Sequence, residues 1–161
     1  MSALRPRRPD VTLRPVEPDD RAVLVEVYAS SRADELAQVA WTDEQRAAFI
    51  EFQFDAQDQA YRQYEEAEFM VVLADGVPAG RLYLARFPGE LRIVDIALLP
   101  AFRGRGIGTS LVEDVMALAA AEGRRVSLHV ERWNPARRLY ERLGFVVADE
   151  EGPVYVRLER V

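Results

Sequence analysis

The sequence contains no cysteine and no lysine, and its single histidine is His129. Without cysteine the chain can form neither disulfide bonds nor thiolate metal sites, and we expect no metal centre. The lack of thiols is compatible with a cytoplasmic location, which we expect for this protein. All 21 basic residues are arginine, so the chain offers no internal lysine as a target for acylation.

Long apolar runs are absent as well. No run approaches the roughly 18 to 20 residues that a membrane-spanning helix needs. The first ten residues, MSALRPRRPD, lack the apolar core of a signal peptide, and we interpret residues 1–9 as a flexible basic tail. The sequence therefore indicates no membrane association.

An overall positive charge is also missing. The formal net charge of -6 argues against sequence-independent nucleic-acid binding, which needs a broad basic face. The charge is uneven, since residues 103–142 carry eight Arg against five acids and residues 26–68 carry eleven acids against three Arg. Such runs are either two solvated faces or the binding sites for one anionic and one cationic ligand.

The composition that remains, 49% hydrophobic and 30% charged, fits one globular domain over residues 1–161. Hydrophobic periodicity and turn signals predict a mixed α/β sheet without internal repeats or linkers. In chain order we expect a strand over 11–16, a helix over 17–31, a helix from 42 or 43 to about 64, a hairpin turning at 75–76, a strand over 91–99, a helix ending at 123, a strand over 124–131, a helix over 134–144 and a hairpin turning at about 150–152.

A glycine-rich loop, RGRGIGTSL, lies between a predicted strand and a predicted helix. A helix N-terminus directs unpaired backbone N–H groups and the positive end of the helix dipole at one point, which suits phosphate oxygens. Gly104, Gly106 and Gly108 let phosphates come close to the main chain. Arg103 and Arg105 can add charge-assisted hydrogen bonds. The alternative is a flexible turn without a ligand.

Two common phosphate-binding motifs fit this loop badly. A P-loop requires Gly-Lys-Ser/Thr, and the chain has no lysine. A dinucleotide fingerprint requires Gly-x-Gly-x-x-Gly, whereas the spacing here is Gly-x-Gly-x-Gly.

The wider context of the loop is more specific. The stretch LLPAFRGRGIGTSLV is followed, 26 residues after Gly108, by NPARRLYERLGF. Together they resemble the GCN5-related N-acetyltransferase (GNAT) superfamily, with its Arg/Gln-x-x-Gly-x-Gly/Ala loop, Asn-x-Ala-x-x-x-Tyr and Gly-Phe. The resemblance covers residues 11–156 in element order and is sharpest over 95–145. It implies the acyl-CoA N-acyltransferase (GNAT) fold, a mostly antiparallel twisted sheet with flanking helices.

The resemblance also implies an acetyl-CoA-dependent N-acetyltransferase that transfers the acetyl group directly to a primary amine in a ternary complex. Asn134 would bond the pantetheine arm of acetyl-CoA, although it can instead be a plain helix cap or serve both purposes. Tyr140 would face the sulfur. The strand backbone at Ile96, Ala97 and Leu98 would also hold the pantetheine. The pyrophosphate would be held by Arg103, Gly104, Arg105, Gly106, Ile107, Gly108 and Thr109.

Amide formation requires a base that takes a proton from the amine and an acid that donates to the departing thiolate. A primary amine with a pKa of about 10 is mostly protonated at neutral pH, so it must lose a proton before or during attack on the thioester. The departing thiolate is stabilised by an acid, and a phenol can donate to it. Tyr140 is the candidate acid. The alternative is a core tyrosine bonded to a carbonyl.

Three residues are candidates for the base. His129 lies in the predicted strand SLHVE, five residues before Asn134, where some relatives carry a glutamate, and the reference pKa of histidine, near 6.5, suits this role. Asp95 stands inside the apolar strand RIVDIALL, where a carboxylate needs a partner or a cleft. It can align the amine, act through water or pair with an arginine. Glu131, on the same strand face as His129, is the third candidate.

In this superfamily the first two helices commonly build the acceptor wall, which here coincides with the acidic residues 26–68. This favours a cationic amine such as a polyamine, an aminoglycoside, an amino-acid derivative or a peptide N-terminus. Trp41, Phe52 and Phe54 are candidates for lining this wall or for the core.

Two readings without catalysis remain open. One is an acyl-CoA-binding sensor that has lost turnover, and the other is an interaction module whose acidic helices bind a basic protein. Dimers are frequent among such folds, so a homodimer is also open.

Overall fold

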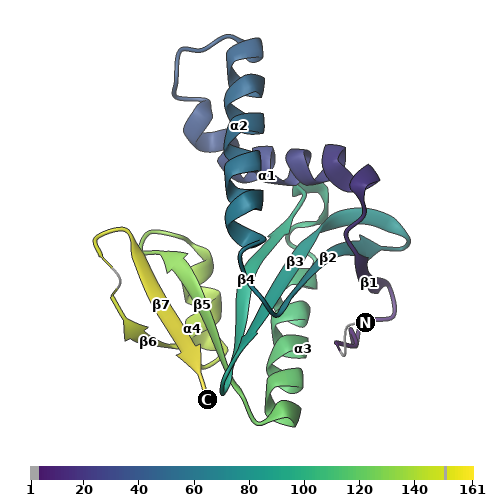
Figure 1. Cartoon of the computed structure of the whole chain (residues 1–161), viewed down its shortest axis with the longest axis vertical. Helices are drawn as coiled ribbons and strands as arrows, with labels where there is room; N and C mark the ends of the chain where they lie inside the picture. Colours follow the sequence, from purple (N-terminus) through teal and green to yellow (C-terminus); the bar gives the residue numbers. More distant parts are fainter. Residues whose placement is uncertain (1–3, 151) are drawn as a thin grey trace.

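The computed structural model describes residues 4–150 and 152–161. Within them a seven-stranded sheet has the order β1-β2-β3-β4-β5-β7-β6 (Figure 1). All neighbouring strands are antiparallel except β4 and β5, which are parallel. The predicted mixed, mostly antiparallel fold is therefore confirmed. The strands are β1 (Val11–Pro15), β2 (Ala67–Ala74), β3 (Val77–Phe87), β4 (Glu90–Leu98), β5 (Arg125–Glu131), β6 (Val146–Asp149) and β7 (Tyr155–Arg160).

Four α-helices are found in the same residues: α1 (Arg21–Leu36), α2 (Asp43–Tyr61), α3 (Ile107–Glu122) and α4 (Ala136–Arg142). The first helix differs from the predicted range over 17–31, because Pro18–Asp20 form a 3-10 turn and the α-helix runs on to Leu36. The start of α2 agrees with the prediction, since Thr42 Oγ1 accepts a hydrogen bond from the Gln45 N–H at 3.1 Å. The Gln45 side chain accepts from the Thr42 N–H in return, which completes a capping box.

The hairpin between β2 and β3 turns where the sequence predicts it. Asp75 and Gly76 both have positive φ, 49° and 77°. Asn, Asp and Gly tolerate this left-handed region, so an Asp-Gly pair matches the twist of a two-residue turn. Gly123, with φ of 68°, ends α3 as expected.

The main core lies between the sheet and α3, which covers one face of it (Figure 1). Leu111 and Val115 of α3 are fully buried against strand residues such as Leu82 and Leu84. A second buried cluster joins α1 and α2 through Leu24, Tyr28, Ile50 and Phe54. The two helices lie at one end of the sheet, against β3 and β4.

The sheet splits between β4 and β5. These strands pair over only four residues each, from Glu90 with Arg125 to Ile93 with Leu128. Beyond this point they diverge toward the end of the molecule at which α1 and α2 lie (Figure 1). Because the strands are parallel, their carboxyl ends border the opening together.

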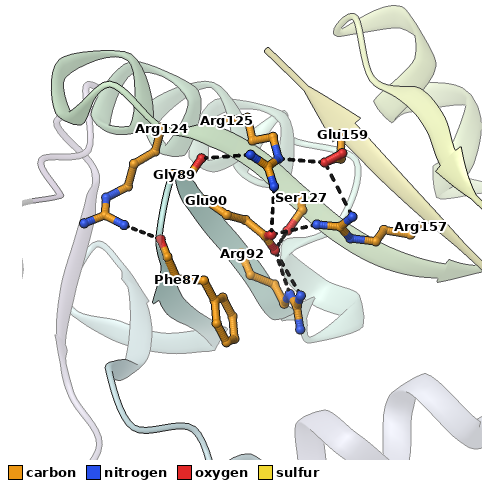
Figure 2. A network of polar contacts seen from close by, with 9 residues as sticks. All are labelled: Phe87, Gly89, Glu90, Arg92, Arg124, Arg125, Ser127, Arg157 and Glu159. Carbon is orange, nitrogen blue, oxygen red and sulfur yellow. Dashed lines mark hydrogen bonds and ion pairs between the residues drawn. The ribbon is translucent and has the colours of Figure 1, made fainter.

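An ionic network closes the opposite end of the split (Figure 2). Glu90 of β4 is 5% exposed and accepts hydrogen bonds from Ser127 Oγ and from Arg92. Arg157 of β7 donates to Glu90 at 2.7 Å, and Arg125 of β5 lies 3.6 Å from the same carboxylate. The network thus ties β4, β5 and β7 together where the parallel pairing begins.

Residues 4–9 are not the loose tail that the sequence suggested. Leu4 is 4% exposed and belongs to the main core. Arg7 Nε donates to the buried Asp114 of α3 at 3.0 Å. The composition is indeed basic, but Arg7 and Arg8 have acidic partners and one apolar side chain anchors the segment. Residues 1–3 lie outside the described residues.

Candidate functional site

Two adjoining cavities lie along the part of β4 that does not pair with β5. We call the one beside the glycine-rich loop the loop cavity, of about 700 Å³, and the one between β4, β5, α1 and α2 the inner cavity, of about 320 Å³. They are neighbours, because five residues line both of them: Ser31, Ile96, Ala97, Asn134 and Tyr140.

The loop cavity brings together the predicted acetyl-CoA-binding residues, with Arg105 as the exception. Its lining comprises Ile96, Ala97 and Leu98 of β4, the loop residues and Asn134 before α4. The guanidinium of Arg105 instead stacks over the Phe102 ring at 5.5 Å. The loop residues that line the cavity are Arg103, Gly104, Gly106, Ile107, Gly108 and Thr109.

The loop presents backbone donors to this cavity. Gly104 and Gly106 have φ of 73° and 81°, a conformation that L side chains rarely adopt. Gly106 is the N-cap of α3 and supplies no capping side chain. The first N–H groups of α3 therefore lack the usual intrahelical or side-chain acceptor, and the positive end of the helix dipole lies among them. This donor set fits the pyrophosphate of acetyl-CoA.

Arg103 is held more tightly than the sequence suggested. Its Nε donates to the Leu98 carbonyl at 2.9 Å and its Nη2 to Ser30 Oγ at 3.2 Å. The guanidinium therefore connects the glycine-rich loop with the end of β4 and with α1, while keeping its positive charge at the edge of the loop cavity.

The free edge of β4 suits an extended ligand. A β-bulge opposite Tyr83 and Leu84 leaves one extra residue on β4, between Ile93 and Asp95. Past Ile93 no described strand pairs with the edge that faces β5. Backbone N–H and C=O groups of Ile96–Leu98 on that edge can bind the amide groups of a pantetheine arm.

Tyr140 lies where the two cavities meet. It is 8% exposed and its ring contacts the Phe145 ring edge-on at 5.7 Å. Burial raises the pKa of Tyr140 to about 12, and the negative charge of Asp95 adds to this shift. The phenol is therefore protonated at neutral pH. No described residue shares a hydrogen bond with its hydroxyl, unlike a core tyrosine bonded to a carbonyl.

Asp95 is paired with an arginine, one of the alternatives that the sequence left open. Its Oδ2 accepts hydrogen bonds from Arg81 Nη2 at 2.8 Å and from the Tyr61 hydroxyl at 2.7 Å. Arg81 is 3% exposed and also donates to Gln57 Oε1 at 2.7 Å. Burial and the charge of Asp95 raise the pKa of Tyr61, so its hydroxyl remains a donor. Both contacts fall on Oδ2, which leaves Oδ1 for a ligand.

The sequence reasoning missed Arg81, Tyr61 and Gln57. A signal was present for Arg81, since it is a charged residue beside the apolar run LYLA of a predicted strand. Tyr61 lies near the end of a predicted helix, and its partner on β4 is 34 residues away, so no local pattern connects the two.

The other two base candidates lie on β5. His129 is exposed and Glu131 is half-buried, and both line the inner cavity with Asp95 and Tyr140. Alternation along β5 places His129 and Glu131 on one face, because successive side chains point to opposite faces. The structure therefore gathers all three candidate bases around the candidate acid.

Asn134 lies one residue before the N-cap of α4, which is Pro135 rather than Asn134. Its Oδ1 nevertheless accepts a hydrogen bond from the Ala136 N–H at 2.9 Å, at the start of α4. The side-chain Nδ2 is left for a ligand. Since Asn134 lines both cavities, this hydrogen bond also fixes the Nδ2 donor where they adjoin.

The acceptor side of the inner cavity differs from the expected acidic wall. Helix α1 contributes Tyr28, Ser31, Arg32 and Glu35. Of the acids in residues 26–68, Glu35 is the one that lines this cavity. Both α1 and α2 line the inner cavity as expected, but most carboxylates of the acidic segment lie elsewhere on these helices and do not reach it. Negative charge at the cavity comes from Glu35, Asp95 and Glu131, against Arg32 and Arg81.

The three aromatic candidates do not line the inner cavity. Trp41 packs on Phe49 with ring centroids 5.0 Å apart, and Phe54 is buried against Tyr28. Phe52 is exposed on α2.

Comparison with known families matches residues 33–145 to the family described as the Acetyltransferase (GNAT) family. A Bacillus subtilis (strain 168) protein, named as a ribosomal protein bS18-alanine N-acetyltransferase, is 32% identical over 80 residues. That match covers 48% of this chain and 53% of the relative, so the chain spans about half the length of this curated relative.

Solved structures show the same fold. PaiA N-acetyltransferase from Thermoplasma acidophilum, in complex with coenzyme A, matches with a TM-score of 0.70 at 20% identity, over 93% of this chain and 98% of that one. Arabidopsis thaliana Naa50, in complex with the bisubstrate analogue CoA-Ac-MVNAL, matches with a TM-score of 0.57 at 17% identity, over 94% and 99%.

Within residues 4–150 and 152–161, every helix is too short or too polar to span a membrane. In the same part of the chain no group of three or more His, Asp or Glu side chains is placed to hold a metal ion.

Proposed function

Because the chain belongs to the acetyltransferase (GNAT) family, we propose that it is an acetyl-CoA-dependent N-acetyltransferase that acts by direct transfer to a primary amine. The observation that carries this proposal is that Tyr140 lines both of the neighbouring cavities. One cavity has the donor set for a pyrophosphate and a pantetheine arm, and the other is lined by the carboxylates of Glu35, Asp95 and Glu131. A donor and an acceptor can therefore meet at one buried phenol.

The chain's own residues hold the acyl donor in this proposal. The first N–H groups of α3, with Arg103 beside them, bind the pyrophosphate. The free edge of β4 at Ile96–Leu98 and the Asn134 Nδ2 bind the pantetheine amides. Acetyl-CoA supplies the thioester carbon that the amine attacks.

Tyr140 serves as the acid. Its raised pKa of about 12 keeps the proton on the phenol at neutral pH. As the carbon–sulfur bond breaks, negative charge gathers on sulfur, and a buried hydroxyl donating to this atom stabilises it. A donor in a low-dielectric site is worth more than the same donor in water.

Asp95 orients the acceptor amine, and His129 accepts its proton. Asp95 has its Oδ2 fixed by two donors, so its Oδ1 can orient an incoming ammonium group at a defined position. His129 lies across the same cavity on β5 and takes the proton, with access to solvent for its release. Glu131 remains the alternative base on this strand face.

The acceptor that we favour is the N-terminal amine of a peptide or protein. The relative from Bacillus subtilis is named for an alanine of a ribosomal protein, and the Naa50 structure holds a peptide-based bisubstrate analogue. Three carboxylates against two guanidinium groups around the inner cavity favour an ammonium group. Polyamines and aminoglycosides have the same amine chemistry and belong in the test.

Titration calorimetry with acetyl-CoA, followed by thiol release against these amines, tests the proposal. We expect binding, with release of CoA that depends on the amine. Binding of acetyl-CoA without release of CoA on any amine would indicate an acyl-CoA sensor. No binding would contradict the assignment of the glycine-rich loop to the pyrophosphate of acetyl-CoA.

A further inference from the structure

We propose that Arg8, in the segment before β1, is a positioning residue that holds the glycine-rich loop in the conformation that binds the acyl donor. This inference rests on the proposed function. It extends the site to residues 4–10, which lie outside the two cavities and outside both sequence motifs.

The contacts of Arg8 reach the loop directly. Its Nη1 donates to the Arg105 carbonyl oxygen at 2.6 Å. The same Nη1 lies 3.5 Å from the point where a Cβ on Gly106 would stand. The guanidinium is therefore packed against the peptide bond between Arg105 and Gly106, next to the N-cap of α3.

Arg8 is itself fixed from the other side. Its Nε and Nη2 donate to the two carboxylate oxygens of Asp10 at 3.0 and 2.8 Å. The Asp10 carbonyl in turn accepts a hydrogen bond from the Asp75 N–H at 2.8 Å, at the hairpin of β2 and β3. A planar guanidinium with both edges engaged has a defined orientation.

Two further anchors hold the segment that carries Arg8. Leu4 is buried in the main core, and Arg7 pairs with Asp114 on α3. The segment is thus attached both to the body of α3, through Arg7, and to the loop that begins α3, through Arg8.

The effect on the loop follows from peptide geometry. In a trans peptide the C=O and the next N–H point to opposite sides, and no cis peptide is present among the described residues. With the Arg105 carbonyl held toward Arg8, the Gly106 N–H must point away from Arg8. Gly106 lines the loop cavity whereas Arg105 does not, so Arg8 selects the orientation in which this donor is available to a phosphate.

The positive charge of Arg8 is neutralised by Asp10, so the effect should depend on geometry more than on charge. Arg8→Lys keeps the charge, but an ammonium group cannot donate to Asp10 and to the Arg105 carbonyl with the planar geometry of a guanidinium. We therefore expect Arg8→Lys to behave like Arg8→Gln. Both should raise the Kd for acetyl-CoA by about five-fold or more, the equivalent of one lost hydrogen bond.

Arg7→Gln is the matched control. It breaks the neighbouring ion pair, and it leaves the buried Asp114 without its guanidinium partner. We expect it to lower the Tm while the Kd for acetyl-CoA stays within two-fold of wild type. Replacement of Arg8 leaves a partner, Asp10, whose side chain is 33% exposed and can be hydrated, whereas that of Asp114 is 1% exposed. The Arg8 variants should therefore lower the Tm less than Arg7→Gln does.

The experiment combines calorimetry, thermal unfolding and amide hydrogen exchange of the free protein. The proposal predicts weaker binding and faster exchange at residues 104–109 in both Arg8 variants, and neither in Arg7→Gln. An unchanged Kd in the Arg8 variants, or equal weakening in Arg7→Gln, would overturn it. If wild type fails to bind acetyl-CoA, the proposed function fails, whereas unchanged exchange in the Arg8 variants counts against the positioning role alone.

Discussion

Arg81 and Asp95 form an ion pair of 2.8 Å between β3 and β4, beside the cavity that we assign to the acceptor amine. The pair leaves Arg81 almost fully buried and Asp95 partly accessible. Tyr61 of α2 adds a second donor to the same carboxylate oxygen. The helix that forms one wall of the inner cavity is thereby connected to the strand that carries the acyl donor in our proposal.

Asp95→Asn tests the role of this carboxylate. The substitution keeps the shape of the side chain but removes the charge that would orient an ammonium group. We expect kcat/KM for the amine to fall about ten-fold, with the Kd for acetyl-CoA unchanged. Because Arg81 loses its buried counter-charge, the variant should also be less stable by about 3 kcal/mol. An unchanged kcat/KM in a folded variant would remove Asp95 from the acceptor site.

Tyr140→Phe removes the proposed acid without changing the packing of the ring. We expect kcat to fall by about ten-fold or more, within the range for a general acid, while calorimetry finds the same affinity for acetyl-CoA. A variant with wild-type kcat would exclude Tyr140 from the chemistry.

The pKa of Tyr140 makes a separate prediction about pH. The acid acts in its protonated form, so its contribution is lost as pH rises through the folded pKa of about 12. The ratio of kcat between wild type and Tyr140→Phe should therefore stay constant from about pH 7 to about pH 10, where an ordinary tyrosine is already half ionised. A kcat ratio that declines between about pH 7 and about pH 10 would show that burial does not raise the pKa of Tyr140 above that of an ordinary tyrosine.

Gly106→Val tests the glycine-rich loop. At φ of 81° a branched side chain is strained, and it adds bulk at the N-cap of α3. We expect the Kd for acetyl-CoA to rise about ten-fold or more, because a phosphate can no longer approach the backbone. Gly76→Val is the matched control, since Gly76 has φ of 77° but lies in the hairpin between β2 and β3. It should cost stability and leave the affinity unchanged.

The network around Glu90 predicts a pH-dependent stability. Hydrogen bonds from Ser127 and Arg92, with the charges of the surrounding arginines, hold the pKa of Glu90 below its usual value despite burial. A lowered folded pKa contributes stability above the unfolded pKa of about 4.3, and this contribution is lost as pH falls through the folded pKa. Glu90→Gln should therefore cost about 3 kcal/mol in urea unfolding at neutral pH and progressively less below about pH 4.

Glu141→Gln serves as the control for this experiment. Its partner Arg137 lies one helical turn away on the surface of α4. An exposed pair of this kind contributes about 0.3–0.5 kcal/mol. A Glu90 variant with a cost as small as this would mean that the network does not stabilise the junction of β4, β5 and β7.

The features that the sequence predicted well are local. The Asp-Gly hairpin, the Thr42 cap and the Gly123 stop depend on residues close together in the chain, and each of them is found as expected. The glycine-rich loop is local too, since its positive φ values and the helix start follow directly from RGRGIG.

The features that the sequence did not predict depend on tertiary pairing. Arg81 of β3 contacts Asp95 of the neighbouring strand β4, and a β-bulge shifts the pairing register of these two strands by one residue. Leu4 is buried because the core accepts one more apolar side chain than the strand pattern indicates. The acidic run in residues 26–68 coincides with the helices expected to form the acceptor wall, but helical periodicity distributes its carboxylates around α1 and α2, so the run itself did not predict which acid reaches the cavity.

The central claim is that the two cavities meet in one catalytic site, and thiol release with a peptide acceptor tests it most directly. Wild-type protein with acetyl-CoA and a peptide that has a free N-terminal amine should release CoA in proportion to N-terminally acetylated peptide, identified by mass spectrometry. The same peptide with a blocked N-terminus should give no release above hydrolysis. Equal release with the blocked peptide, or none with any amine although acetyl-CoA binds, would contradict the account.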